Sequence, residues 1–201
     1  MAINVIQVGP QNAQDGVQLV ARGGKQLDTI VSQLHGRRYE STYRGNMFSV
    51  MTQGTAITTT AALATTWTGL GIANAVGSGV NLVLTEFWAS QFAVGAAATI
   101  GIMGGTGVIA ASLTPQNRVI GLGTASKATA SAGATISTPL LIKTFGSLGS
   151  AATTAYALEN GIFVDLDGSI IIPPGSFVAS YTSVVTTSAL QFGYAWEEVA
   201  I

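Results

Sequence analysis

The chain has 201 residues, and its 8 Lys and Arg against 9 Asp and Glu give a formal net charge of −1, so we expect no binding to nucleic acid by the chain as a whole. Charged residues make up 8% of the sequence, against about 25% in an ordinary soluble domain, and the lack of cysteine excludes disulfides and thiolate catalysis. Leu, Ile, Val and Phe still supply enough apolar surface for a packed core, and the length fits one domain with an N-terminal arm.

The first 44 residues hold most of the basic side chains. We therefore predict a basic N-terminal arm over residues 1–44 and a neutral domain over residues 45–201. Arginines and tyrosines are interleaved near the end of the arm, and such side chains form bidentate hydrogen bonds and stack on flat groups. We predict that the contact site with neighbouring protein consists of Arg37, Arg38, Tyr39, Tyr43 and Arg44. In the alternative interpretation, these arginines pair with Glu40, with Asp28 or with an acidic partner surface.

The arm also contains the clearest helical pattern of the chain. Apolar residues recur at helical spacing from Leu27 to Leu34, and Gly36 stands where such a helix would end. We predict one short helix here, which either covers an end of the fold or docks on a neighbouring subunit. His35 is the only histidine, and the neighbouring arginines favour its neutral form, so we interpret it as a surface or contact imidazole.

Glycines punctuate the middle of the chain. Gly69 with Gly71, and Gly121 with Gly123, match only the start of a dinucleotide-binding fingerprint, and we interpret both pairs as turns. Residues 121–138 are rich in Gly, Ser and Ala, which predicts long loops or weak edge strands.

Residues 81–88 are rich in strand-forming side chains and predict a β-strand. Regular alternation places Leu82, Leu84, Glu86 and Trp88 on one face of this strand. Glu86 is then a half-buried acid, and we predict that it pairs with Arg118, at a strand edge or between subunits.

The segment of residues 87–117 contains no charged side chain, and no flanking cluster of Lys and Arg sets a membrane orientation for it. Its length would suit a membrane span, but glycines and polar residues interrupt it. We predict instead a strand ending near Phe92 and further strands at residues 98–103 and 108–113, and no membrane partner.

Two aspartates and a proline pair organise the next segment. Short apolar runs at residues 162–166 and 169–172 flank Asp167 and Gly168, a dipeptide typical of a tight hairpin turn. Asp165 and Asp167 also resemble the opening of a calcium loop, but Ser176 stands where the completing Glu is required, so we predict no metal site. Pro-Pro-Gly at residues 173–175 predicts a turn before a strand at residues 176–185.

The last segment alternates most regularly. Leu190, Phe192, Tyr194 and Trp196 occupy every second position, which predicts a strand with these four side chains in the core. Because Val, Ile and Thr are abundant and Lys, Arg and Glu are scarce, we predict that the domain is all-β, an antiparallel β-sandwich.

The scarcity of charge also bears on function. Centres of protein interfaces are depleted in Lys, Glu and Asp, and neighbouring subunits can cover exposed strand edges. We therefore expect a non-enzymatic protein that works by assembly with other protein, with no catalytic residues and no cofactor.

Five sequence motifs resemble small virion proteins of tailed bacteriophages: LHGRRY at residues 34–39, YRGNMF at 43–48, GSGVNLVL at 77–84, IPPGS at 172–176 and YAWEEV at 194–199. The resemblance implies a jelly-roll-like sandwich that serves as a capsid decoration, or cement, protein on the head surface. It further implies self-association, with a trimer favoured, and an arm that reaches over the major capsid protein.

Two other functions remain open at this point. A receptor- or glycan-binding module of a phage tail or fibre would present exposed aromatic side chains such as Trp67 to a sugar, although Trp67 fits a core position equally well. A hydrolase would require Glu86, Asp165 and Asp167 to converge in a cleft.

Overall fold

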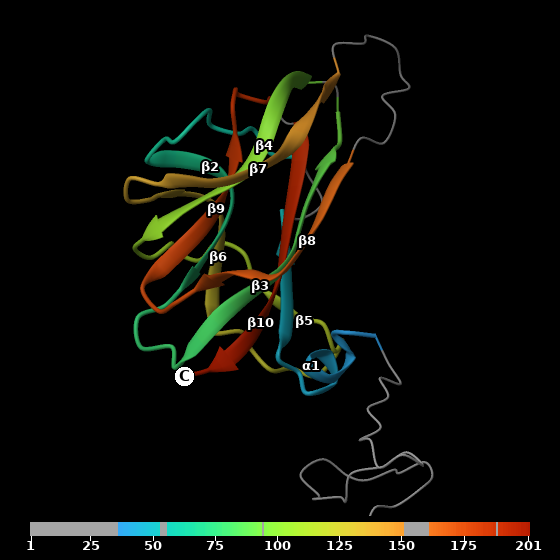
Figure 1. The fold of residues 1–201 in the computed structure, drawn as a ribbon. Helices are drawn as coiled ribbons and strands as arrows, with labels where there is room; N and C mark the ends of the chain where they lie inside the picture. Colours follow the sequence, from blue (N-terminus) through green and yellow to red (C-terminus); the bar gives the residue numbers. More distant parts are fainter. Residues whose placement is uncertain (1–35, 53–55, 94, 151–160, 188) are drawn as a thin grey trace, which may run out of the picture. The chain divides into compact units, whose positions relative to one another are not determined.

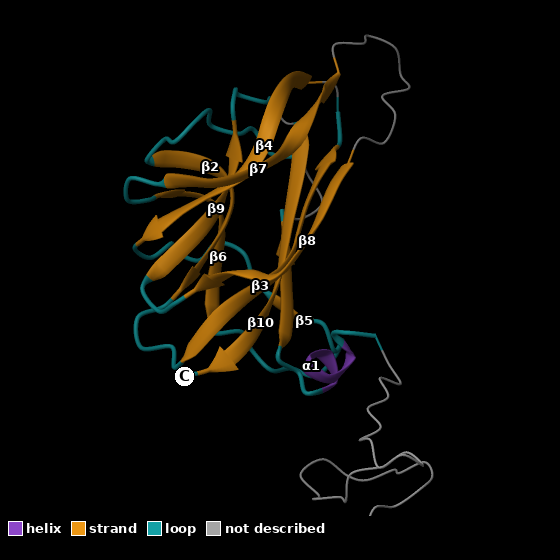
Figure 2. Ribbon diagram, viewed as in Figure 1, coloured by secondary structure: helices purple, strands orange, loops and turns teal. Residues whose placement is uncertain are grey.

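The computed structural model describes residues 36–52, 56–93, 95–150, 161–187 and 189–201. The chain divides into two units, Met1–Glu40 and Ser41–Ile201. The helix predicted at residues 27–34 and His35 lie outside the described residues, and the predicted boundary at residue 44 stays a prediction. All strands of the described part belong to the second unit (Figures 1 and 2).

In the described residues, one short helix, α1 (Tyr39–Tyr43), precedes the strands, and Gly45 caps its C-terminal end. Gly45 has a φ of 76°, and its N–H donates to the carbonyl of Thr42 over 2.9 Å. The N–H of Asn46 donates to the carbonyl of Ser41 over 3.0 Å. This pair of bonds closes a helix on a left-handed residue, and glycine adopts that conformation without strain.

In the described residues, ten strands form two antiparallel sheets of five strands each. In order across the first sheet, the strands are β5 (Gln116–Asn117), β1 (Met47–Met51), β10 (Leu190–Ala200), β3 (Val80–Gln91) and β8 (Gly161–Ile172). In order across the second sheet, they are β6 (Ala128–Thr135), β2 (Thr66–Asn74), β9 (Ser176–Thr182), β4 (Gly95–Thr106) and β7 (Leu140–Ser150).

The strand pairing is that of a jelly roll. β1 pairs with β10, β2 with β9, β3 with β8 and β4 with β7, all antiparallel. The chain is therefore one long hairpin, with β1 to β4 leading out and β7 to β10 returning, folded so that successive pairs alternate between the two sheets. β5 and β6 belong to the turn of this hairpin and lie beside β1 and β2. The predicted antiparallel, jelly-roll-like β-sandwich is confirmed.

The inner faces of the two sheets enclose the core (Figure 2). Leu190, Phe192, Tyr194 and Trp196 are all buried in the largest apolar cluster, as the alternation predicts. The ring of Phe87 packs against those of Phe192 and Tyr194, with centroids 6.3 Å and 5.1 Å away. Inward aromatic side chains from neighbouring strands thus hold the first sheet to the interior.

A β-bulge interrupts the predicted alternation of residues 81–88. Leu82 and Leu84 are buried, and strict alternation would bury position 86 next. The next fully buried apolar side chain is instead that of Phe87. The register shifts at this point, because Trp196 faces Leu84 while Ala195 faces Glu86, which leaves one extra residue in β3. The extra residue removes Glu86 from the face of the two leucines, so the strict alternation predicted here is wrong.

The hairpin predicted at Asp167 and Gly168 is also wrong. Both residues have the positive φ that the dipeptide suggests, 47° and 76°, yet they lie inside the single strand β8. The register against β3 passes from Asp165 opposite Glu86 to Ile170 opposite Leu84. The left-handed residues therefore form a wide bulge in an edge strand instead of a reversal of the chain.

Of the remaining turn and strand predictions, most agree with the structure and one is wrong. The turn at residues 173–175 is present, with Gly175 at a φ of 80°, and β9 follows it. β4 contains the strand predicted at residues 98–103, and β6 is an edge strand within residues 121–138. Residues 108–113, predicted as a strand, form a loop with one bridge between Leu113 and Ala130.

Candidate interaction site

The predicted contact residues fall in both units of the chain. Arg37, Arg38 and Tyr39 belong to Met1–Glu40, where Arg37 and Tyr39 are exposed and Arg38 is half-buried. Tyr43 and Arg44 belong to Ser41–Ile201, and both are exposed. Each of the five takes part in at least one polar, ring or electrostatic interaction. That they form one contact site with neighbouring protein stays a prediction.

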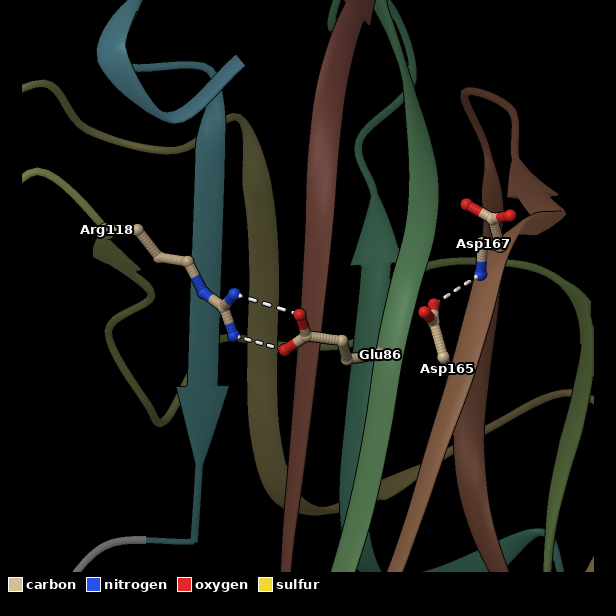
Figure 3. Close-up of polar contacts among 4 residues, drawn as sticks. All are labelled: Glu86, Arg118, Asp165 and Asp167. Atoms are coloured by element: carbon tan, nitrogen blue, oxygen red, sulfur yellow. Dashed lines mark hydrogen bonds and ion pairs between the residues drawn. The ribbon is translucent and has the colours of Figure 1, made fainter. Parts of the chain in front are cut away.

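The predicted pairing of Glu86 with Arg118 is present within the chain (Figure 3). Both guanidinium nitrogens Nη1 and Nη2 donate to the carboxylate, over 3.2 Å and 2.5 Å. The backbone N–H of Arg118 donates to the carbonyl of Met47, which fixes the segment after β5 against β1. The side chain of Glu86 is 15% exposed and that of Arg118 is 29% exposed, so the pair lies at the surface of the first sheet, partly shielded from water.

The three carboxylates of the hydrolase hypothesis lie on neighbouring strands. Glu86 faces Asp165 in the register between β3 and β8, but Arg118 occupies both oxygens of Glu86. Asp165 and Asp167 are exposed on β8, where Asp165 Oδ1 accepts a hydrogen bond from the N–H of Asp167 over 3.1 Å (Figure 3). In the described part of the chain, no three His, Cys, Asp or Glu side chains gather as ligands for a metal ion.

Trp67 is a core residue, and its proposed role as an exposed sugar-stacking aromatic is wrong. Its side chain is 2% exposed, and its indole N–H donates to the carbonyl of Ser180 over 3.0 Å. The indole lies over Gly69, where an added Cβ would come within 2.4 Å of the Trp67 ring and of the Ser180 hydroxyl. Gly69 and Gly71 therefore lie inside β2, leaving room for this ring, and do not form the predicted turn.

A half-open hollow lies at β5 and the connection that follows it towards β6. The sequence pattern does not predict this hollow. Its volume is about 500 Å³, and residues 114–117, 119–121 and 123–125 line it. The Asn117 amide is engaged within the chain, donating to the carbonyl of Gly45 over 2.6 Å and accepting from the N–H of Val119 over 2.8 Å. The lining holds hydroxyls, amides and apolar groups but no charged side chain.

Comparison with known proteins yields no match among family models, curated proteins or solved structures. Within the described residues, no helix has both the length and the apolar character to cross a membrane.

Proposed function

We propose that this protein is a structural component of a virus particle, a decoration or cement protein that self-associates and binds the shell of a phage head. Its partner on the particle is the major capsid protein, contacted through Arg37, Arg38, Tyr39, Tyr43 and Arg44. The protein acts without catalysis and without a cofactor, and it has no nucleic-acid or membrane partner.

The observation that carries this proposal is the combination of a jelly-roll strand order with a composition poor in charged residues. Jelly rolls occur in viral capsid and lectin domains, so the fold raises the expectation of a virion role by analogy. The fold alone does not favour assembly over enzymatic use, whereas the composition does, because charged residues make up only 8% of the chain.

The arrangement of the described charges adds to this support. Glu86 and Arg118 neutralise each other, and Glu198 accepts hydrogen bonds from Ser126 and from the backbone N–H of Lys127. Several ionic side chains thus hold the chain's own loops in place. Large parts of the outer surface consist of Thr, Ser, Gly and apolar side chains, which favour contact with other protein.

The glycan-binding alternative loses the example named for it, because Trp67 is buried. The hollow between β5 and β6 has no aromatic side chain in its lining.

The experiment is a binding assay with purified phage shells that lack the protein. Full-length chain is expected to sediment with the shells, and electron microscopy is expected to place it on the outside of the head. The variant Arg37→Ala/Arg38→Ala/Arg44→Ala is expected to bind at least about tenfold more weakly, since each lost bidentate contact removes charge-assisted hydrogen bonds. Equal binding by this variant would overturn the assigned contact site, and no binding by the full chain would overturn the function.

A further inference from the structure

One side of the sandwich consists of two long edge strands. β8 is the last strand of the first sheet and β7 the last strand of the second, and the two strands contact each other. β7 ends at Ser150, which pairs with Gly95, and β8 begins at Gly161, which pairs with Ser90, so the end of β7 and the start of β8 both lie beside the connection from β3 to β4. We call this surface, formed by β7 and β8, the long edge.

The opposite side of the sandwich is built differently. There the edge strands are β5, with two residues, and β6, with eight, whereas β7 has eleven and β8 has twelve. Short edge strands offer few backbone groups to another chain, and long ones offer many. The insertion of β5 and β6 thus covers β1 and β2 and leaves the long edge as the outermost part of both sheets on its side.

The long edge is rich in exposed apolar side chains. Leu140 is 70% exposed, Phe163 is 68% exposed, and the exposed set also includes Leu141, Ile142 and Ile171. A monomeric protein usually places charged residues along such an edge to prevent association. The charged residues present in the described strands are Lys143 on β7, and Asp165 and Asp167 on β8.

The distribution of these charges discriminates between possible ways of joining two copies. A rotation about an axis perpendicular to the sheets would bring β7 against β7 and β8 against β8, and would place like charges together. A rotation about an axis parallel to the strands brings β7 of one copy against β8 of the next. Only the second arrangement brings the strand that carries Lys143 against the strand that carries Asp165 and Asp167, and complementary charges of this kind select partner and register.

We propose that copies of this chain associate in a closed ring about an axis parallel to the strands, with β7 of each copy alongside β8 of the next. The proposal rests on the self-association in the proposed function and names the surface that performs it. Three copies close the ring in the trimer that we favour, and two copies would close it through the same contact. The interface is heterologous in the ring of three and isologous in the ring of two, and neither ring leaves a long edge exposed.

The area of the long edge is sufficient for a stable contact. A strand of twelve residues is about 40 Å long, and two sheets about 10 Å apart form a rim roughly 20 Å wide with their side chains. The product is about 800 Å² per copy. In a ring of two this equals what each partner buries in an interface of standard size, and in a ring of three it is divided between two neighbours, about 400 Å² for each. Residues with positive φ, including Gly146, Gly149 and Asp167, interrupt the row of backbone groups, so side-chain packing and charge must hold the copies together.

The chain lacks cysteine, so disulfide trapping reports the contact without background. Two single variants of the full chain, Lys143→Cys and Asp165→Cys, are mixed after one has been given a mass tag, and are then oxidised. We expect the tagged and untagged chains to link to each other far more than either links to itself. Self-linked Lys143→Cys dimers as the main product, or no intermolecular disulfide at all, would overturn the proposal.

Charge reversal provides a second measurement that depends on the same contact. Lys143→Glu and Asp165→Lys/Asp167→Lys are each expected to raise the apparent dissociation constant at least about tenfold, measured by analytical ultracentrifugation, because each places like charges together. The combination of all three substitutions is expected to restore association. Lys127→Glu, an exposed reversal beside the opposite edge strand β6, is the matched control, and melting curves confirm that each variant is folded.

The outcome separates this inference from the proposed function. Variants that become monomeric on charge reversal support the long edge whether or not they bind shells. Oligomers that persist unchanged in both reversed variants, or a wild-type chain that is monomeric at high concentration, would overturn it. Shell binding by such a chain would leave the decoration function standing without the ring.

Discussion

Arg118 binds Glu86 across two intervening strands. Arg118 follows β5 at one side of the first sheet, Glu86 lies on β3, and β1 and β10 run between them. The bulge in β3 takes Glu86 off the inward face of Leu82 and Leu84, and the hydrogen bond from the Arg118 N–H to Met47 anchors the other end. The ion pair therefore ties the β5 segment, which has only two residues of strand, to the middle of its sheet.

Replacement of Glu86 by Gln removes the charge and one acceptor while keeping the shape of the side chain. We expect Glu86→Gln to lower the free energy of unfolding by about 1–2 kcal/mol, above the median for surface pairs because the contact is bidentate and half-shielded. A double-mutant cycle with Arg118→Met, measured by urea denaturation, should show a coupling of about 1 kcal/mol. Asp165→Asn, on an exposed neighbour, is the control, and equal effects of the two amide variants would contradict the assignment.

A methyl group at Gly69 is expected to displace the indole ring of Trp67 from its position in the core. The added Cβ would lie 2.4 Å from both the indole ring and the Ser180 hydroxyl, at a φ of 156° that side chains rarely adopt. We expect Gly69→Ala to lower the free energy of unfolding by about 2–4 kcal/mol, by overpacking and backbone strain together. Its control, Gly161→Ala, would meet its nearest neighbour at 3.6 Å without a positive φ and should change stability by less than about 1 kcal/mol. Tryptophan fluorescence should shift in the first variant alone.

The sequence is informative wherever one strand face is buried. The alternation of Leu190 to Trp196 identified β10 and its core side chains because this strand lies at the centre of its sheet, where every second residue faces the interior. The fold class followed from the same pattern and from composition. The partner of Glu86 was also predictable, because few other basic residues occur in the body of the chain.

The failures arise where a local signal has two structural solutions. Asp167 and Gly168 adopt the predicted left-handed conformation, but the same φ values serve a bulge as well as a turn, and pairing with β3 decides between them. Gly69 and Gly71 were interpreted as turn residues, whereas their lack of a side chain admits the Trp67 ring. Such close approaches between distant residues leave no periodic trace in a single sequence. Which strands lie at the edges of the sheets depends on pairing between distant segments, so the alternation of side chains does not predict the long edge either.

Three threonines form a buried hydrogen-bonded cluster that ties the segment before β2 to the end of β9. Thr59 Oγ1 lies 2.8 Å from Thr186 Oγ1 and accepts from Thr182 Oγ1 over 2.9 Å and from the N–H of Thr186 over 3.1 Å. Thr59→Val keeps the shape and removes the central hydroxyl, so we expect a loss of about 1–3 kcal/mol in the free energy of unfolding. The exposed Thr135→Val on β6 is the matched control, and calorimetric melting compares the two.

Tyr194 is fully buried, and its hydroxyl has no hydrogen-bond partner among the described residues. A buried hydroxyl without a partner is destabilising, so Tyr194→Phe should leave the free energy of unfolding at neutral pH unchanged or raise it by up to about 1 kcal/mol. Exposed Tyr43 provides the control substitution, Tyr43→Phe, for which we expect no change beyond about 0.5 kcal/mol. A clear loss of stability in Tyr194→Phe would show that the hydroxyl has a partner after all.

The burial of Tyr194 also predicts how the free energy of unfolding depends on pH in the alkaline range. Burial raises the pKa of Tyr194 well above its ordinary value of 10.0, because the phenolate would lose its hydration in the core. The folded chain therefore keeps this proton at pH values where the unfolded chain releases it, so the contribution of Tyr194 is fully present below about pH 10 and declines as the pH rises towards the folded pKa. Urea denaturation between neutral pH and pH 11 should show a shallower decline in Tyr194→Phe than in the wild type. Parallel declines in the two proteins would mean that Tyr194 ionises equally in the folded and unfolded chains, which is incompatible with its burial.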